Sequence, residues 1–190
     1  NSTAWAGSAG TYSRPIEEPE RGLSNLGRDV VREMNRLGMI VDVSHVSDKT
    51  FWDVLETSRA PVFASHSSCR ALSNVRRNLS DEMIAALAKK GGTVQINFAC
   101  QFLSASGKAT IADVVAHIDH AVKIGGVDAV GIGSDFDGIQ CAPAGLDDVG
   151  KFPNLTRALL EKGYSDAAIR KIYGGNVLRV MRAVEKAAIR

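Results

Sequence analysis

Short apolar runs alternate with helical segments along most of this chain, and this alternation limits the fold more than any other feature. The runs are bounded by Gly, Ser or Pro, as β-strands often are. Between them, apolar residues recur at helical spacing, often behind a capping Ser and before a terminating Gly. Such alternation predicts parallel strands with both faces covered. The expected strands are 39–44, 61–65, 93–98 and 129–134, and the expected helices are 24–38, 47–58, 80–91, 110–126, 154–163, 165–173 and 176–188.

Residues that can bind a metal or move a proton follow three of these strands. They are His45, His66 and Asp135. A doubly wound sheet gathers its ligands at one switch point, whereas the strand ends of a (β/α)8 barrel converge on one face. The spacing therefore favours an α/β fold of the TIM-type (β/α)8 barrel class. Because a complete barrel needs about 250 residues and eight strands, we expect this chain to supply about the last four strand–helix units and the C-terminal helices.

The composition argues against several classes of protein. The formal net charge is +2 and the basic residues are dispersed, so a nucleic-acid groove or a polybasic membrane patch is not expected. No apolar run approaches the roughly 18 residues of a membrane span. The three cysteines, Cys69, Cys100 and Cys141, are odd in number, widely spaced and without a CxxC pair, so no disulfide framework is expected.

Five stretches from about residue 22 onward cover most of the chain and carry a resemblance to a known family. They are GLSNLGRDVVREMNRLGMIVDVSHVSD, APVFASHSSCRALSNVRRNLSDEM, VQINF, AVGIGSDFDG and GGNVLRVM. In this order they resemble the C-terminal half of the membrane dipeptidase (renal dipeptidase) family, a branch of the metal-dependent amidohydrolase superfamily.

The resemblance implies an eight-stranded barrel that holds two zinc ions. It assigns His45 and His66 as zinc ligands, Asp135 as the catalytic aspartate and Arg77 as the residue that binds the substrate carboxylate. A His-x-Asp ligand pair and a bridging glutamate belong to the N-terminal half of the family. We therefore expect residues 1–190 to be the C-terminal half of a single hydrolase barrel domain, with the N-terminal half absent from this chain.

The chemistry of these residue types agrees with the resemblance. Neutral imidazole is a good zinc ligand, but His45 and His66 alone leave each metal under-coordinated. A hydroxide that bridges two zincs would attack the amide carbonyl while the zincs polarise its oxygen, with Asp135 first as general base and then as general acid. On its residues alone, Asp135 is equally a turn-forming residue. Arg77 can hold a free carboxylate by a bidentate pair, whereas Arg76 is expected at the surface.

The most strongly indicated function is a zinc-dependent dipeptidase that hydrolyses the amide bond of small dipeptides. One alternative is a non-catalytic metal-binding relative, and another is an amidohydrolase that acts on a different small amide or ester. The expected partners are a dipeptide and the missing half-barrel, from the same protein or a companion chain, with a homodimer left open. A cytoplasmic bacterial enzyme is favoured, and export or membrane anchoring is left open.

Two other patterns resemble functional sites but have simpler explanations. His117 and His120 are three residues apart, yet they fall in the middle of an expected helix and away from the strand ends. Cys69 follows His66 closely, but a small buried thiol explains it better than a nucleophile does. Neither pattern is expected to bind metal or react with substrate.

Overall fold

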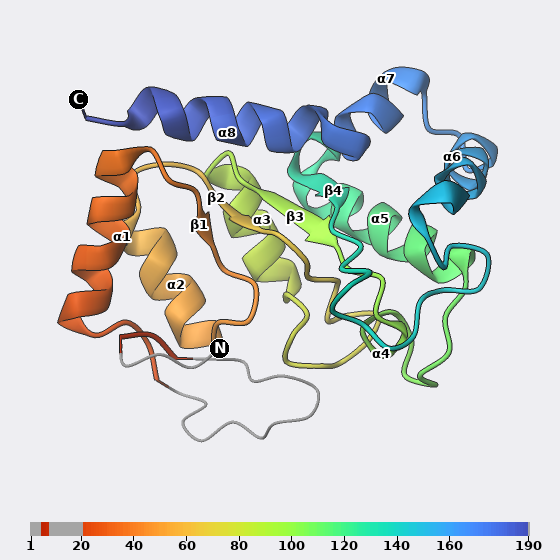
Figure 1. Cartoon of the computed structure of the whole chain (residues 1–190), viewed down its shortest axis with the longest axis horizontal. Helices are drawn as coiled ribbons and strands as arrows, with labels where there is room; N and C mark the ends of the chain where they lie inside the picture. The colour runs from red at the N-terminus through yellow and green to blue at the C-terminus, as the bar shows by residue number, and fades with distance from the viewer. Residues whose placement is uncertain (1–4, 8–20, 190) are drawn as a thin grey trace.

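Four strands form one parallel sheet in the computed structural model, which describes residues 5–7 and 21–189 (Figure 1). The strands lie in the order β1-β2-β3-β4, with Val41 opposite Val62 and Val94 opposite Val130. This order follows the chain without the reversal of a doubly wound sheet, as in the wall of a barrel. The strands are β1 (Val41–Asp42), β2 (Val62–Ala64), β3 (Thr93–Ile96) and β4 (Val130–Ile132).

Helices connect the strands and follow the last one, as the sequence predicts. Ser24, Ser47 and Ser80 each cap a helix by accepting a backbone N–H three residues ahead. None of the helices among the described residues is long and apolar enough to span a membrane. The helices are α1 (Asn25–Leu37), α2 (Asp48–Thr57), α3 (Asp81–Lys89), α4 (Cys100–Leu103), α5 (Ile111–Gly125), α6 (Phe152–Glu161), α7 (Asp166–Arg170) and α8 (Asn176–Ala187), with short turns η1 (Val127–Ala129), η2 (Val149–Lys151) and η3 (Lys171–Gly175).

The core lies between the sheet and the helices that connect its strands. Burying these apolar side chains is the main force that holds the strands in register. At the opposite end of the strands from His45, His66 and Asp135, α8 crosses the N-terminal ends of the strands (Figure 1), where Arg179 donates to Gly91 O and Asp128 O at 2.7 Å each. Fully buried members of the core include Phe51, Val62, Ala64, Ile84, Leu87, Val94, Ile96, Ile118 and Val130.

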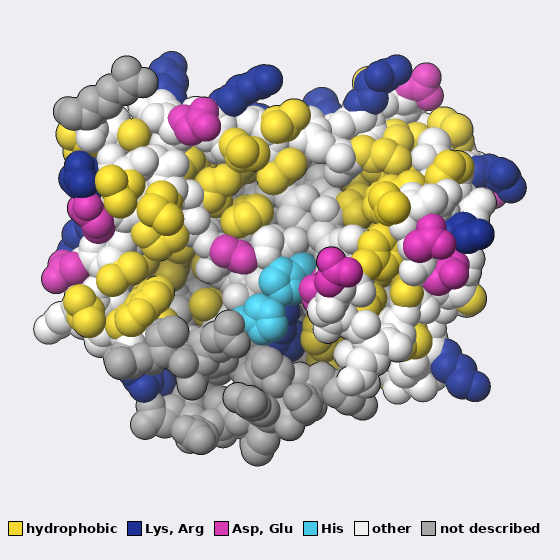
Figure 2. Space-filling model, viewed as in Figure 1, with side chains coloured by type: hydrophobic (Ala, Val, Ile, Leu, Met, Phe, Trp, Pro, Cys, Tyr) yellow, Lys and Arg dark blue, Asp and Glu magenta, His cyan; other side chains and the backbone are white. Residues whose placement is uncertain are grey.

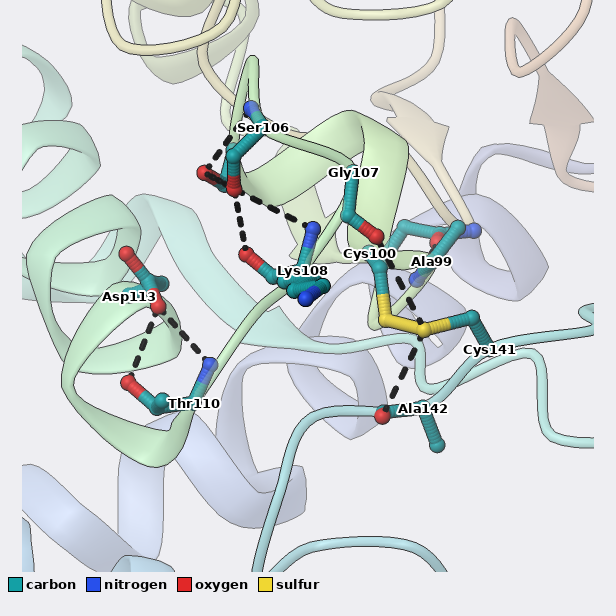
Figure 3. Close-up of a disulfide and its surroundings, with 11 residues drawn as sticks. Ala99, Cys100, Ser106, Gly107, Lys108, Thr110, Asp113, Cys141 and Ala142 are labelled. Atoms are coloured by element: carbon teal, nitrogen blue, oxygen red, sulfur yellow. Dashed lines mark hydrogen bonds between the residues drawn. A yellow bond between two sulfur atoms is a disulfide. The ribbon is translucent and has the colours of Figure 1, made fainter.

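The expectation about the cysteines is wrong in one respect. Cys100 and Cys141 form a disulfide, with Cα atoms 5.6 Å apart (Figure 3), and Cys100 N also donates to Cys141 O at 3.1 Å. The pair is 41 residues apart in sequence. It is brought together because Cys100 follows β3 and Cys141 follows the neighbouring β4 at the same edge of the sheet. Cys69 is a free, buried thiol, as expected.

Candidate active site

His45 and His66 meet at the carboxyl edge of the sheet. Their Nε2 atoms lie 2.8 Å apart and their ring centroids 4.8 Å apart, although 21 residues separate them. Each follows one of two neighbouring parallel strands, β1 and β2, so the fold delivers both side chains to the same place. Histidine side chains are grouped at the centre of the face seen in Figure 2, between acidic side chains.

Both imidazoles are held in the neutral form. Burial lowers the pKa of His45 to about 4, and the nearby charge of Arg77 and the ring of His66 lower it further. Burial, followed by Arg77, also lowers the pKa of His66, while Asp135 and Asp42 oppose the shift. A neutral imidazole keeps a lone pair that a metal can accept.

The geometry of the two rings fits a shared metal or two neighbouring ones. A tetrahedral zinc with two nitrogen ligands at about 2.0–2.1 Å separates them by about 3.3 Å, half an ångström or so more than the 2.8 Å found between the Nε2 atoms. A small rotation of either ring supplies this difference. The described residues contain no group of three or more His, Cys, Asp and Glu side chains that could hold a metal, so within them the pair is a two-ligand set.

Asp135 follows β4 at the same edge of the sheet. Its backbone adopts a left-handed conformation, with φ of 61°, and its carbonyl closes a turn with Gly138 N at 2.9 Å. A Cβ on Gly138 would lie 2.3 Å from Asp135 Oδ1, so a larger residue at this position would displace the carboxylate from its present place. The buried Asn97 donates to Asp135 Oδ2 at 3.1 Å. Asp135 is therefore a turn residue with its carboxylate held in place by the end of β3.

Arg77 is a buried cation with few partners. Its side chain contacts the Phe102 ring, with Cζ 5.4 Å from the ring centroid, and Nη2 donates to His66 O at 3.4 Å. Within the described part of the chain it forms no ion pair with a carboxylate, and burial lowers its pKa to about 10. The neighbouring Arg76 is exposed, as expected. Most of the N–H groups of Arg77 thus remain available to an anionic ligand.

The two other histidines do not join this group. His117 is buried in α5, where Nδ1 accepts from Cys69 N and Nε2 donates to Leu103 O, both at 3.0 Å. His120 Nε2 lies 2.7 Å from Asp81 Oδ1. Each ring therefore has its own structural partners. Burial and the charge of Asp81 raise the pKa of the Cys69 thiol to about 12, so this cysteine is an unreactive thiol at neutral pH.

Two residues of the site received no role from the sequence pattern. Asp42 ends β1, and Ser65 directly precedes His66. Aspartate is rare within strands, so a carboxylate inside the apolar run before His45 was the signal available in the sequence. The recurrence of Ser before both histidines was a second signal.

Comparison with known proteins shows the family of this chain. The family model described as membrane dipeptidase (peptidase family M19) matches residues 1–190. The chain belongs to the membrane dipeptidase family. A curated member, an uncharacterized dipeptidase of Schizosaccharomyces pombe, is 45% identical over 174 residues, which make up 90% of this chain and 42% of that protein.

Two solved structures of similar proteins share the fold. A metallopeptidase of Rhodobacter sphaeroides, liganded with a phosphinate mimic of the dipeptide L-Ala-D-Ala, is 37% identical with a TM-score of 0.83 and aligns with 87% of this chain and 49% of its own. The probable dipeptidase PvdM of Pseudomonas aeruginosa is 31% identical with a TM-score of 0.90 and aligns with 99% of this chain and 61% of its own. These membrane dipeptidase relatives are longer, and this chain corresponds to part of their barrel.

Proposed function

We propose that this chain is the C-terminal half of the barrel domain of a zinc-dependent dipeptidase, and that residues outside residues 1–190 complete the barrel. The assembled protein is called the complete enzyme below. The observation that carries the proposal is the convergence of two neutral histidine nitrogens, His45 Nε2 and His66 Nε2, at 2.8 Å. They lie at the same edge of the sheet as a carboxylate, Asp135, and a buried cation, Arg77.

His45 and His66 would hold zinc, with two ions in each complete site and the remaining ligands on the rest of the barrel. Two histidines cannot saturate a tetrahedral zinc. Bound zinc would supply a nucleophile from water at neutral pH and would polarise the substrate carbonyl. A homodimer of the complete enzyme stays a prediction.

Arg77 would bind the free carboxylate of a dipeptide. Its guanidinium is buried, has a single hydrogen bond to His66 O, and forms no ion pair within the described residues, although the charges of Asp135 and Asp42 act on it. A bidentate pair with a carboxylate would satisfy it and fix the substrate end. The dipeptide mimic bound to the Rhodobacter relative supports this substrate class.

Asp135 would move the proton. As general base it accepts a proton when the nucleophile attacks the amide carbon, and as general acid it returns that proton to the leaving amine. Asn97 donates a hydrogen bond to its carboxylate, and Gly138 leaves room for the carboxylate in this orientation. The left-handed backbone of Asp135 supports this role, because such strained conformations are concentrated at functional sites.

The test is hydrolysis of free dipeptides and of the matching dipeptide amides by the complete enzyme and its Arg77→Ala variant. Loss of Arg77 should reduce kcat/KM for free dipeptides much more than for the amides, because only the former present a carboxylate. Equal losses on both substrates would show that Arg77 is structural. Zinc binding without hydrolysis of any dipeptide would identify a non-catalytic relative instead.

A further inference from the structure

A short hydrogen-bonded chain leads from Asp42 through Ser65 to His66. Ser65 Oγ lies 2.5 Å from Asp42 Oδ2 and 2.6 Å from His66 Nδ1. The other ring nitrogen of His66, Nε2, faces His45. The chain therefore ends on the side of the His66 ring that points away from the candidate metal.

The chemistry of Asp42, Ser65 and His66 determines which of them donates and which accepts in each hydrogen bond. A carboxylate accepts hydrogen bonds and donates none, so the single proton of Ser65 points to Asp42. Ser65 Oγ can then only accept from His66, which requires the imidazole proton on Nδ1. In a neutral ring this leaves the lone pair on Nε2, the atom that lies 2.8 Å from His45 Nε2.

The same carboxylate also fixes the backbone on both sides of the site. Asp42 Oδ1 accepts from Ser44 N at 2.9 Å and from Ser65 N at 3.0 Å, so it joins the ends of β1 and β2. Ser44 Oγ in turn accepts from His66 N at 2.9 Å. These contacts set the spacing of the two segments that carry the histidines.

We propose that Asp42 and Ser65 are positioning residues that select the Nδ1-protonated tautomer of His66 and aim its Nε2 lone pair at the metal. This inference rests on the proposed zinc function. Outer partners of metal-bound histidines commonly contribute about 10- to 100-fold to metal affinity or activity. Both residues would act through His66 and not by contact with the substrate.

Asp42→Asn gives the sharpest test because it reverses the direction of both hydrogen bonds of Ser65. The asparagine oxygen can keep the two backbone contacts, which turns its amide toward Ser65. Ser65 would then accept from the amide and donate to His66 Nδ1, so the imidazole proton moves to Nε2 and blocks metal binding. Ser65→Ala keeps both backbone contacts of Asp42 and breaks only the chain, and Ser65→Thr retains the hydroxyl.

Two measurements on the complete enzyme follow the tautomer of His66 and the affinity for zinc. Nitrogen-15 NMR of the metal-free protein reports the tautomer of His66, and competition with a chelator reports affinity for Zn²⁺ alone. We expect Asp42→Asn to shift the proton to Nε2 and to weaken zinc binding by about 10- to 100-fold. Ser65→Ala should weaken it as well, Ser65→Thr should restore it, and Asp42→Asn combined with Ser65→Ala should bind zinc at least as well as Asp42→Asn alone.

The matched control is Asp29→Asn, which makes the same chemical change at an exposed residue of α1 paired with Arg32. An unchanged His66 tautomer and unchanged zinc affinity in both Asp42→Asn and Ser65→Ala would overturn the inference. Should Asp42→Asn fail to fold, Ser65→Ala and Ser65→Thr still decide the matter. His66→Ala distinguishes failure of the proposed zinc site from failure of the positioning role. If this variant keeps its zinc affinity, the proposed zinc site is wrong. If it alone among the variants loses zinc, only the positioning role of Asp42 and Ser65 is wrong.

Discussion

His45 and Asp135 share a left-handed backbone conformation, with φ of 73° and 61°, and within the described residues they are the two non-glycine positions that adopt it. A side chain in this region costs on the order of 1–3 kcal/mol, and such strain is concentrated at functional sites. Both residues are candidates for the active site on independent grounds. The strain is thus located at the ends of β1 and β4, where the proposed chemistry needs side chains aimed at one point.

Substitution of His45 should show this strain directly. Glycine accepts positive φ and alanine does not, so we expect the His45→Gly variant of the metal-free complete enzyme to be more stable than His45→Ala by about 1 kcal/mol. Urea denaturation measures the difference in the free energy of unfolding. Both variants lack the imidazole, so lost contacts cancel in the comparison. An alanine variant as stable as the glycine variant would show that the backbone here is not strained.

The disulfide should hold the loop that carries Asp135. Cys141 lies in this loop, while Cys100 lies in the segment that follows Asn97, the residue bonded to Asp135. Replacing both cysteines by serine should lower the stability of the complete enzyme by about 4 kcal/mol, the chain-entropy value for a loop of this length. Turnover should fall while zinc content stays constant.

A reducing agent provides the control for the cysteine variant. It should bring the unmodified enzyme to the stability and turnover of the double-serine variant, and it should leave that variant unchanged. A double-serine variant as active and as stable as the unmodified enzyme would exclude a role for the disulfide in holding this loop.

His117 should make the protein less stable in mild acid. Burial lowers its pKa in the folded state, opposed by its hydrogen bond to Leu103 O and by Asp113 and reinforced by His120. Below the unfolded value of about 6.5, the unfolded chain binds a proton that the folded chain does not. Stability present above this pH is therefore lost as the pH falls toward the folded pKa, by at most about 1.4 kcal/mol per pH unit for one proton.

Unfolding of the zinc-loaded complete enzyme between pH 7.5 and 5 measures this effect. His117→Gln keeps an acceptor for Cys69 N and a donor for Leu103 O but cannot titrate, so its stability should depend less steeply on pH. Equal slopes for the two proteins would show that His117 is not responsible.

Replacing Asp135 should separate proton transfer from metal binding. Asp135→Asn keeps the size of the side chain but removes the base, so turnover should fall by roughly 10²- to 10⁴-fold while zinc content persists. Steady-state kinetics and metal analysis of the same sample measure both quantities. A variant depleted of zinc would instead identify Asp135 as a metal ligand.

The sequence predicts the parts of the fold that depend on local pattern. Four strands, their parallel arrangement and the meeting of His45 with His66 follow from periodicity and from the geometry of neighbouring parallel strands. The helix α4 was not predicted, because four residues are too few to show a helical period. The end of the expected helix 165–173 differs because α7 stops at Arg170 and passes into a π-type turn, in which Gly174 leaves helical backbone.

Long-range pairings are the features that local pattern does not reveal. The Cys100–Cys141 bond depends on which strands are adjacent at one edge, and three scattered cysteines do not specify that. The hydrogen bond from Ser65 to Asp42 depends on the register of β1 and β2. The family resemblance distinguished Arg77 from Arg76 by its role, but the burial of Arg77 beside the exposed Arg76 was not predicted, because the two residues are alike in local sequence.

Zinc content of the complete enzyme is the most direct test of whether His45 and His66 bind metal. Metal analysis should find two zinc ions per active site in the unmodified protein, and the variant with both His45 and His66 replaced by alanine should have lost zinc. The same exchange at His120, which contacts Asp81 outside the site, should leave the zinc content unchanged. Full zinc occupancy in the protein that lacks both His45 and His66 would contradict the assignment of these two residues as metal ligands.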